Sequence, residues 1–135
     1  MIAAVCIDDR NGLLFNRRRL SRDRAQQEDL LALCGKKPLW LAPYSASLFD
    51  WAPERVRVEE KFLEQAAPGD ICFVEDRQLP AEKLEGLILY RWNRAYPSDV
   101  RLELDLSQFA LTERAEFSGT SHETITRERY TRKED

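Results

Sequence analysis

The sequence predicts an α/β fold: a single domain built on a mixed sheet, with a parallel core followed by antiparallel C-terminal strands. Ile2–Ile7 and Ile71–Val74 are unbroken apolar runs, which is typical of strands covered on both faces of a parallel sheet. Helical patterns separate strands of this kind along the chain. Arg101–Leu106 instead alternates leucine with polar residues, which indicates an antiparallel strand with one solvated face.

Length and composition describe an ordinary soluble globular domain. The 135 residues are enough for one domain, 1–135, with a core that needs no disulfide or metal. An apolar fraction of 43% with 33% charged residues is far from the disordered and membrane classes. The net charge of -3 argues against a general nucleic-acid or membrane-surface binder, because such proteins need a dominant positive surface.

The opening segment and the cysteines indicate a cytoplasmic protein. The first apolar run ends at Asp8 and Asp9, before it is long enough for a signal peptide or a membrane span, so we expect neither. Three cysteines, an odd number, lie in apolar surroundings: Cys6, Cys34 and Cys72. We therefore expect reduced, buried thiols and no disulfide.

The first half of the chain alternates strands with helices. After the strand Ile2–Ile7, Ser21 is placed to cap a helix over Arg22–Cys34, and Gly35 is placed to end it. A second buried strand follows at Leu39–Ala42. Further along we expect a brief helix capped by Ser45 or Ser47 that runs through Phe49 and Trp51. A strand at Val56–Val58 and a helix within Glu59–Ala67 follow.

The second half reads mainly as strands. Ile71–Val74 is followed by a short helix at Pro80–Leu84 and a strand that begins at Leu87–Tyr90. After Arg101–Leu106, the segment Phe109–Phe117 looks extended. Ser121–Arg132 has two interpretations. Thr120 and Glu123 fit a capping box, which would start a helix, but the apolar stripe is too thin and we favour a strand.

With these elements in order, the chain resembles dihydrofolate reductase. In that family the opening strand leads through an Asp and a Gly to a loop that ends in Leu-Pro-x-Asp or Leu-Pro-x-Glu, whose acid holds the pteridine. Asp8, Gly12 and the run Leu20-Ser21-Arg22-Asp23 occupy similar places. The resemblance implies that Asp23 corresponds to the substrate-binding acid.

The family's cofactor elements are altered in this chain. Where the family has Gly-Arg-x-Thr at the start of a helix, the chain has Ala42-Pro43-Tyr44-Ser45, which keeps only the hydroxyl. Where the family has paired glycines after a buried strand, Glu75 and Asp76 stand. A carboxylate close to a pyrophosphate would cost about 4 kcal/mol per charge pair at an effective dielectric of 20. We therefore expect no nicotinamide cofactor, and no other cofactor, in the family's manner.

Six arginines crowd the segment before and into the first helix: Arg10, Arg17, Arg18, Arg19, Arg22 and Arg24. A run of this kind is commonly a solvated loop. Its place at the carboxyl edge of the sheet makes capture of an anion the functional alternative. Asp23 has two interpretations as well: a carboxylate that interacts with the helix dipole, or, as the resemblance implies, an acceptor for an amino-heterocycle.

His122 is the only histidine, and no two cysteines have the C-x-x-C spacing, so we expect no metal site. A lone histidine is commonly a structural hydrogen-bonding residue. General acid–base catalysis with Asp23 is the alternative. It would make the protein a hydrolase or transferase acting on a phosphorylated substrate, including a nucleotide or RNA.

The leading hypothesis is a non-reductase of dihydrofolate reductase-like fold that binds a small anionic or heterocyclic ligand, or a partner. The ligand would lie near the arginine-rich loop and Asp23. The expected ligand-binding set is completed by Tyr44, Ser45 and Arg94. Arg94 is included because it lies beside aromatic residues that could stack on a planar group. An exposed sheet edge could also serve a homodimer.

Overall fold

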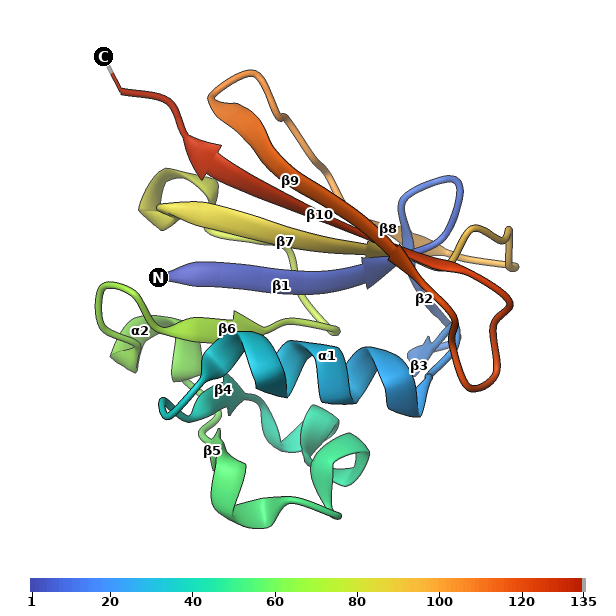
Figure 1. The fold of residues 1–135 in the computed structure, drawn as a ribbon, viewed down its shortest axis with the longest axis horizontal. Helices are drawn as coiled ribbons and strands as arrows, with labels where there is room; N and C mark the ends of the chain where they lie inside the picture. Colours follow the sequence, from blue (N-terminus) through green and yellow to red (C-terminus); the bar gives the residue numbers. More distant parts are fainter. Residues whose placement is uncertain (135) are drawn as a thin grey trace.

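The computed structural model describes residues 1–134. Its main sheet has seven strands: β1 (Ile2–Ile7), β4 (Leu39–Leu41), β5 (Val56–Val58), β6 (Ile71–Phe73), β7 (Gly86–Arg91), β9 (Phe109–Phe117) and β10 (Ile125–Arg132). They lie in the order β5-β4-β6-β1-β7-β10-β9 (Figure 1). The first five are parallel, and β10 runs antiparallel to both β7 and β9. The predicted mixed sheet with antiparallel C-terminal strands is confirmed.

A smaller sheet and two helices complete the fold. The smaller sheet contains β2 (Gly12–Phe15), β3 (Arg18–Arg19) and β8 (Val100–Arg101), in the order β3-β2-β8. The helices are α1 (Arg24–Cys34) and α2 (Phe62–Gln65), and three short 3₁₀ segments connect strands: η1 (Pro43–Phe49), η2 (Pro53–Arg55) and η3 (Ala81–Lys83). The apolar loop after β1 therefore folds back as a hairpin.

The main sheet is covered on both faces, as its apolar strands predict. Because side chains alternate along a strand, Ala3 and Val5 of β1 enter one core while Ala4 enters the other. Helix α1 covers the second face with Leu30 and Leu31 (Figure 1). The first face is covered by α2, the β2–β3 hairpin and the segment before β9.

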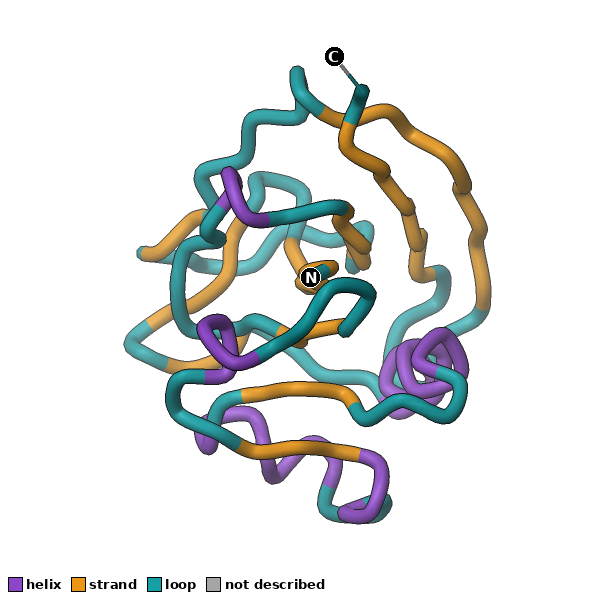
Figure 2. The backbone as a smooth tube through the Cα atoms, turned by 90° about the vertical axis from the view of Figure 1, so that its left-hand side faces the viewer, coloured by secondary structure: helices purple, strands orange, loops and turns teal. Residues whose placement is uncertain are grey.

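The C-terminal hairpin forms the far edge of the sheet. Strands β9 and β10 are long and curve away from the parallel strands in Figure 2, with a register shift between Arg129 and Tyr130. The segment from Ser121 onward is thus a strand from Ile125, and the alternative helix is wrong. The thin apolar stripe that disfavoured the helix is the reason.

Helix α1 begins two residues later than predicted. Asp23 is the N-cap: its carboxylate accepts hydrogen bonds from the backbone N–H groups of Ala25 and Gln26. The predicted cap, Ser21, lies before the helix, and its hydroxyl contacts His122 instead of the helix backbone. The sequence holds two capping residue types close together, and contacts with a distant loop select the second.

The other short helices also differ from the predictions. Neither Ser45 nor Ser47 caps η1, which is a 3₁₀ segment that starts at Pro43 without a side-chain cap. The helix expected within Glu59–Ala67 shrinks to α2, and that at Pro80–Leu84 to η3. Proline favours the first turn of such segments, but short apolar stretches do not sustain a longer helix.

The alternating segment Arg101–Leu106 is not a strand of the main sheet. Only Val100–Arg101 pairs, with β2 in the smaller sheet. Leu102 is nevertheless buried, and Leu104 and Leu106 pack against the same core. The alternation correctly predicts which side chains face inward, but backbone pairing needs a neighbouring strand, which this segment has only at its start.

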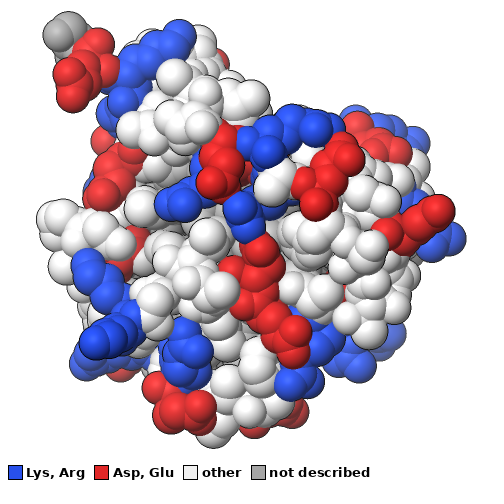
Figure 3. Space-filling model, in the orientation of Figure 1, with Lys and Arg blue, Asp and Glu red and all other residues white. Residues whose placement is uncertain are grey.

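Surface and thiol features follow from the same chain segments. Acidic and basic side chains are interspersed on the face drawn in Figure 3. Within residues 1–134 no helix has the length and apolar character that crossing a bilayer requires, and no cluster of side chains is suited to hold a metal ion. The three cysteines are free, and burial raises the pKa of the Cys34 thiol to about 11 and of the Cys72 thiol to about 12.

Candidate functional site

The parallel strands end at a common edge, and the polar residues that follow them gather there. Asp8 follows β1, Glu75 comes two residues after β6, and Trp92 follows β7. In open α/β sheets this carboxyl edge is where ligands bind. The β2–β3 hairpin and the N-terminus of α1 lie at the same edge (Figure 1).

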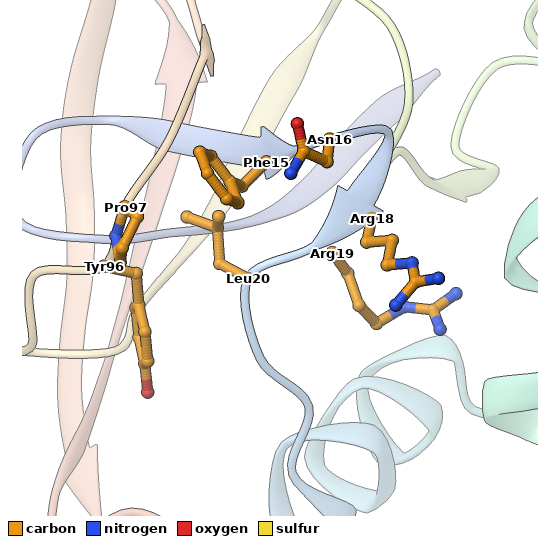
Figure 4. Close-up of a pocket in the computed structure, with 7 residues that line it drawn as sticks. All are labelled: Phe15, Asn16, Arg18, Arg19, Leu20, Tyr96 and Pro97. Carbon is orange, nitrogen blue, oxygen red and sulfur yellow. The ribbon is translucent and has the colours of Figure 1, made fainter.

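A pocket of about 580 Å³ opens between the β2–β3 hairpin and a segment that follows β7. Its lining is partly apolar and partly cationic, with the two guanidinium groups on one side and the rings on the other (Figure 4). The lining residues are Phe15, Asn16, Arg18, Arg19, Leu20, Tyr96 and Pro97.

The hairpin that carries the arginines turns tightly. Asn16 and Arg17 have φ angles of 50° and 64°, so both central residues are left-handed, as the twist of a two-residue hairpin turn requires. Asp99 accepts a hydrogen bond from the Asn16 backbone N–H at 3.0 Å. The Tyr44 hydroxyl donates to the Arg17 carbonyl at 3.3 Å. These contacts fix the hairpin over the edge of the sheet and leave Arg18 exposed.

Arg19 faces inward and binds Glu75. Its Nε and Nη2 donate to the two carboxylate oxygens of Glu75 at 2.9 and 3.1 Å, in the two-pronged geometry that arginine favours. Nη2 also donates to the Tyr44 carbonyl, and the guanidinium lies 5.0 Å from the Tyr44 ring centre. Arg19 thus closes the edge of the sheet next to β6.

Asp23 is buried and joins α1 to the loop before β10. Besides capping α1, its Oδ1 accepts from the Thr120 backbone N–H at 2.9 Å. Its Oδ2 accepts from the backbone N–H groups of Ser121 and His122, at 2.8 and 3.1 Å, and from the Ser121 hydroxyl. Both carboxylate oxygens therefore already face protein donors.

The environment of Asp23 stabilises its charged form. Burial alone would raise the pKa of this carboxyl, but the hydrogen bonds from Thr120, His122 and Ser121 outweigh burial and hold the pKa well below the usual range for aspartate. Oδ2 lies 2.9 Å from Nδ1 of His122. Since Asp23 is ionised, the geometry assigns the Nδ1 proton to a hydrogen bond with it.

His122 is held on every side. Its Nε2 lies 3.0 Å from the Ser21 hydroxyl and 3.0 Å from the Tyr96 hydroxyl. The Trp92 ring stacks on the imidazole with centres 4.4 Å apart and an angle of 16° between the planes. The side chain is only 3% exposed. The structure therefore brings together the two members of the predicted catalytic pair, Asp23 and His122, and adds a serine and a tyrosine.

Asp8 positions the segment that carries Tyr96. Its Oδ2 accepts from the Tyr96 backbone N–H at 3.0 Å, and its Oδ1 accepts from the N–H groups of Arg10 and Gly12 at 2.9 and 2.7 Å. Burial favours the neutral carboxyl, yet these bonds lower its pKa. Gly12 is required here because a Cβ would lie 2.8 Å from Asp8 Oδ1.

The remaining predicted ligand-binding residues are divided among other surroundings. Arg22 and Arg24 lie on the far side of Asp23, where the Arg24 guanidinium covers the Trp51 ring at 3.6 Å. Ser45 is buried and its hydroxyl finds no hydrogen-bond partner within residues 1–134. Arg94 is exposed beside Tyr96, with its guanidinium 5.6 Å from that ring.

The edge of the sheet does not fit a dinucleotide in the manner that the resemblance implies. A pyrophosphate beside β6 would need bare backbone, but Glu75 is there and holds Arg19. Asp76 pairs with the neighbouring Arg77 at 2.9 Å. Each carboxylate thus has its own arginine, so its repulsion of a pyrophosphate would be weaker than that of an unpaired charge.

Ser21, Trp92 and Tyr96 are site residues that sequence reasoning did not assign to His122. Their contacts with it span 101, 30 and 26 positions of the chain, and no local pattern announces them. One signal was available. Trp92 directly follows β7 and has the same parity as Tyr90, which places its side chain on the same face of the sheet.

Comparison with known proteins agrees with this geometry only at the level of the fold. No family model and no curated protein matches the chain. Among solved structures it is similar to dihydrofolate reductase from Enterococcus faecalis complexed with NADP(H) and RAB-propyl, with a TM-score of 0.69 and 13% sequence identity, over 99% of this chain and 97% of that one. The chain therefore has a dihydrofolate reductase-like fold.

Proposed function

We propose that the protein is a non-reductase of dihydrofolate reductase-like fold that binds a small ligand with an anionic group next to a flat apolar part. The ligand lies in the pocket between the β2–β3 hairpin and Tyr96–Pro97. The observation that carries the proposal is the pairing of exposed Arg18 with the apolar wall of Phe15 and Tyr96 in one cavity.

The charge distribution favours an anion at this place. Arg19 is engaged by Glu75, whereas Arg18 is exposed at the opening of the same pocket. Asn16 adds a neutral side chain with both donor and acceptor atoms. A guanidinium with a free fork binds carboxylate or phosphate through two parallel hydrogen bonds.

The rings of the pocket favour a flat group. Phe15 is 43% exposed, which leaves its ring available to a ligand. Tyr96, Leu20 and Pro97 lie across from the arginines (Figure 4). An aromatic group of the ligand, buried between these side chains, makes apolar contacts that inorganic phosphate cannot make.

An amino-heterocycle held by Asp23 is less well supported. Both Asp23 oxygens accept hydrogen bonds from α1 and from the 120–122 loop, and the side chain is 0% exposed. A ligand would have to displace these donors at a cost of roughly 1–3 kcal/mol for each one left unsatisfied. A hydrolase or transferase acting on a phosphorylated substrate has the same difficulty if Asp23 must touch the substrate.

Calorimetric titration with phenyl phosphate, inorganic phosphate and benzamidine tests the proposal. We expect phenyl phosphate to bind more tightly than inorganic phosphate and benzamidine not to bind, because the pocket selects an anion with a ring. Equal affinity for phosphate and phenyl phosphate, or preference for the cation, would contradict the proposed pocket chemistry.

Two variants locate the binding. Arg18→Ala should weaken phenyl phosphate binding roughly 10- to 100-fold, which corresponds to one lost charge-assisted interaction. Arg57→Ala is the matched control, since Arg57 is an exposed arginine on β5, an edge strand that three strands separate from β7. Equal loss in the two variants would show general charge attraction in place of a site.

Titration with NADPH, followed by quenching of tryptophan fluorescence, tests the non-reductase part separately. We expect no saturable quenching, because Glu75, paired with Arg19, stands where the resemblance puts a glycine beside the pyrophosphate. Tight binding of NADPH would overturn this part and leave the anion pocket to be judged on its own titration.

A further inference from the structure

Ser21, His122 and Asp23 form a continuous chain of hydrogen-bonding atoms. Ser21 Oγ lies 3.0 Å from His122 Nε2, and on the other side of the ring Nδ1 lies 2.9 Å from Asp23 Oδ2. These are the two contacts by which a histidine can accept a serine proton while a carboxylate fixes its tautomer. Ser21 comes from the loop before α1, and His122 from the loop before β10.

We propose that Ser21 is a nucleophile activated by His122, and that the protein catalyses acyl transfer from small esters to water. Asp23 is a positioning residue, which holds the imidazole with its proton on Nδ1 so that Nε2 is the accepting nitrogen. This inference does not rest on the proposed anion site.

Ser21 Oγ attacks the ester carbonyl carbon and its proton moves to His122 Nε2. The bond from that carbon to the alkoxy oxygen breaks, the Nε2 proton goes to the departing alcohol, and an acyl group stays on Ser21. Water then attacks the acyl carbon, gives one proton to Nε2, and the acid leaves as Ser21 recovers that proton.

Burial separates the roles of the three residues. The Asp23 and His122 side chains are 0% and 3% exposed, and Trp92 stacks on the imidazole, so the pair is rigid and shielded from water. Ser21 is half-buried and is the least buried of the three residues. Nucleophilic catalysis requires a base that is held in place and a nucleophile that is less buried than the base. The Asp23–His122 pair and Ser21 have this arrangement.

The Tyr96 hydroxyl contacts the same His122 nitrogen as the Ser21 hydroxyl does. Its hydroxyl lies 3.0 Å from the same Nε2, and its ring lines the pocket described above. When Nε2 takes the serine proton it can no longer accept from Tyr96. The phenol is then released to donate to the oxygen that gains negative charge on the attacked carbonyl, which is the place where a donor stabilises acyl transfer most.

The test uses 4-nitrophenyl acetate with the full chain. We expect a burst of 4-nitrophenol and an acetyl adduct that peptide mass mapping places on Ser21. Ser21→Ala should lose the burst and reduce turnover roughly 100-fold or more. Ser47→Ala, which removes an exposed serine hydroxyl on η1, is the matched control and should behave as the unmodified protein.

The absence of a burst, an adduct on Ser121 or another residue, or equal turnover by Ser21→Ala would overturn the proposal. His122→Gln provides a second test, because it removes the base that activates Ser21 and leaves the Ser21 hydroxyl in place. It should abolish the Ser21 adduct while thermal unfolding reports whether the fold survives. If that variant does not fold, the Ser21→Ala comparison decides alone, since that change removes one hydroxyl from a half-buried residue.

Discussion

Asp23 shows how a single buried side chain can be both a structural and a chemical feature. It caps α1 through Ala25 and Gln26 and also fixes the loop that carries His122, 99 positions further along the chain. The sequence could predict that a carboxylate would lie at the start of α1, and the resemblance could match it with a functional acid. The number of donors from the 120–122 loop could not be predicted, because they come from the other end of the chain.

Replacing Asp23 by Asn should destabilise the fold by roughly 2–3 kcal/mol, since an amide nitrogen would face donors and a buried charged acceptor would be lost. The effect should depend on pH. The pKa of Asp23 is lower in the folded protein than in the unfolded chain, so its contribution is present above the unfolded value of about 3.9 and disappears as the pH falls below it. Urea unfolding of both proteins at neutral and acid pH measures this.

The outcome that would contradict the argument is a stability difference between the two proteins that stays constant from neutral to acid pH. Acid sensitivity that remains in Asp23→Asn belongs to other carboxyls, among them Asp8, whose pKa is also lowered.

Gly119 is a second residue whose identity the buried carboxylate dictates. A Cβ there would lie 2.6 Å from Asp23 Oδ2 and 2.7 Å from the His122 carbonyl oxygen. Gly119→Ala should therefore cost about 1–3 kcal/mol of stability, as overpacking does in other proteins. Thermal unfolding checks this, with Ser118→Ala on the neighbouring exposed position as the control. Equal melting temperatures in the two variants would show that the loop can yield.

At the level of elements, apolar runs predicted the buried strands well, because burial on both faces of a parallel sheet is itself what demands such runs. The β2–β3 hairpin was missed. Its turn residues, Asn16 and Arg17, lack the glycine that commonly marks a two-residue turn, and its two-residue partner strand is too short for a pattern. The alternating segment after β8 led to the opposite error. It predicted a strand of the sheet where the backbone is unpaired, because leucines can face inward without strand pairing.

A polar network attaches α1 to the sheet. The Tyr90 hydroxyl donates to Asp29 Oδ2 at 2.6 Å, and Arg127 Nη1 donates to the same carboxylate at 2.6 and 2.9 Å. Asp29→Ala and Tyr90→Phe should each destabilise the protein, and a double-mutant cycle should give a coupling of roughly 0.5–3 kcal/mol between them. Additive effects of the two changes in urea unfolding would show that the hydroxyl and the carboxylate act independently.

For the whole molecule, the order of strands and helices was enough to predict the sheet and its two-sided burial. The site was harder because the pocket and the residues around His122 come from distant segments: the β2–β3 hairpin, the loop before α1, the segment after β7 and the loop before β10. Local propensity decides the elements, but only the packed sheet decides which of their ends meet. Asp23 and His122 could be suspected as a pair on chemical grounds, whereas Ser21 could not.

The two cores should unfold together, because alternate residues of the same strands enter both. Trp40 lies in one core and Trp92 in the other, while β1 contributes Val5 to the first and Ala4 to the second. Variants that keep only one of these tryptophans should show coincident urea transitions by fluorescence, and these should coincide with circular dichroism. Transitions at different urea concentrations would mean that one face of the sheet melts alone.

The tight turn at Asn16–Arg17 has a consequence for how this protein can change over time. Successive side chains of a strand point to opposite sides, so gaining or losing a single residue in that turn would exchange the directions of Arg18 and Arg19. Arg19 would then point away from Glu75, and Arg18, which is now exposed, would point inward. The hairpin can therefore tolerate substitution at its tip far more readily than a change in length.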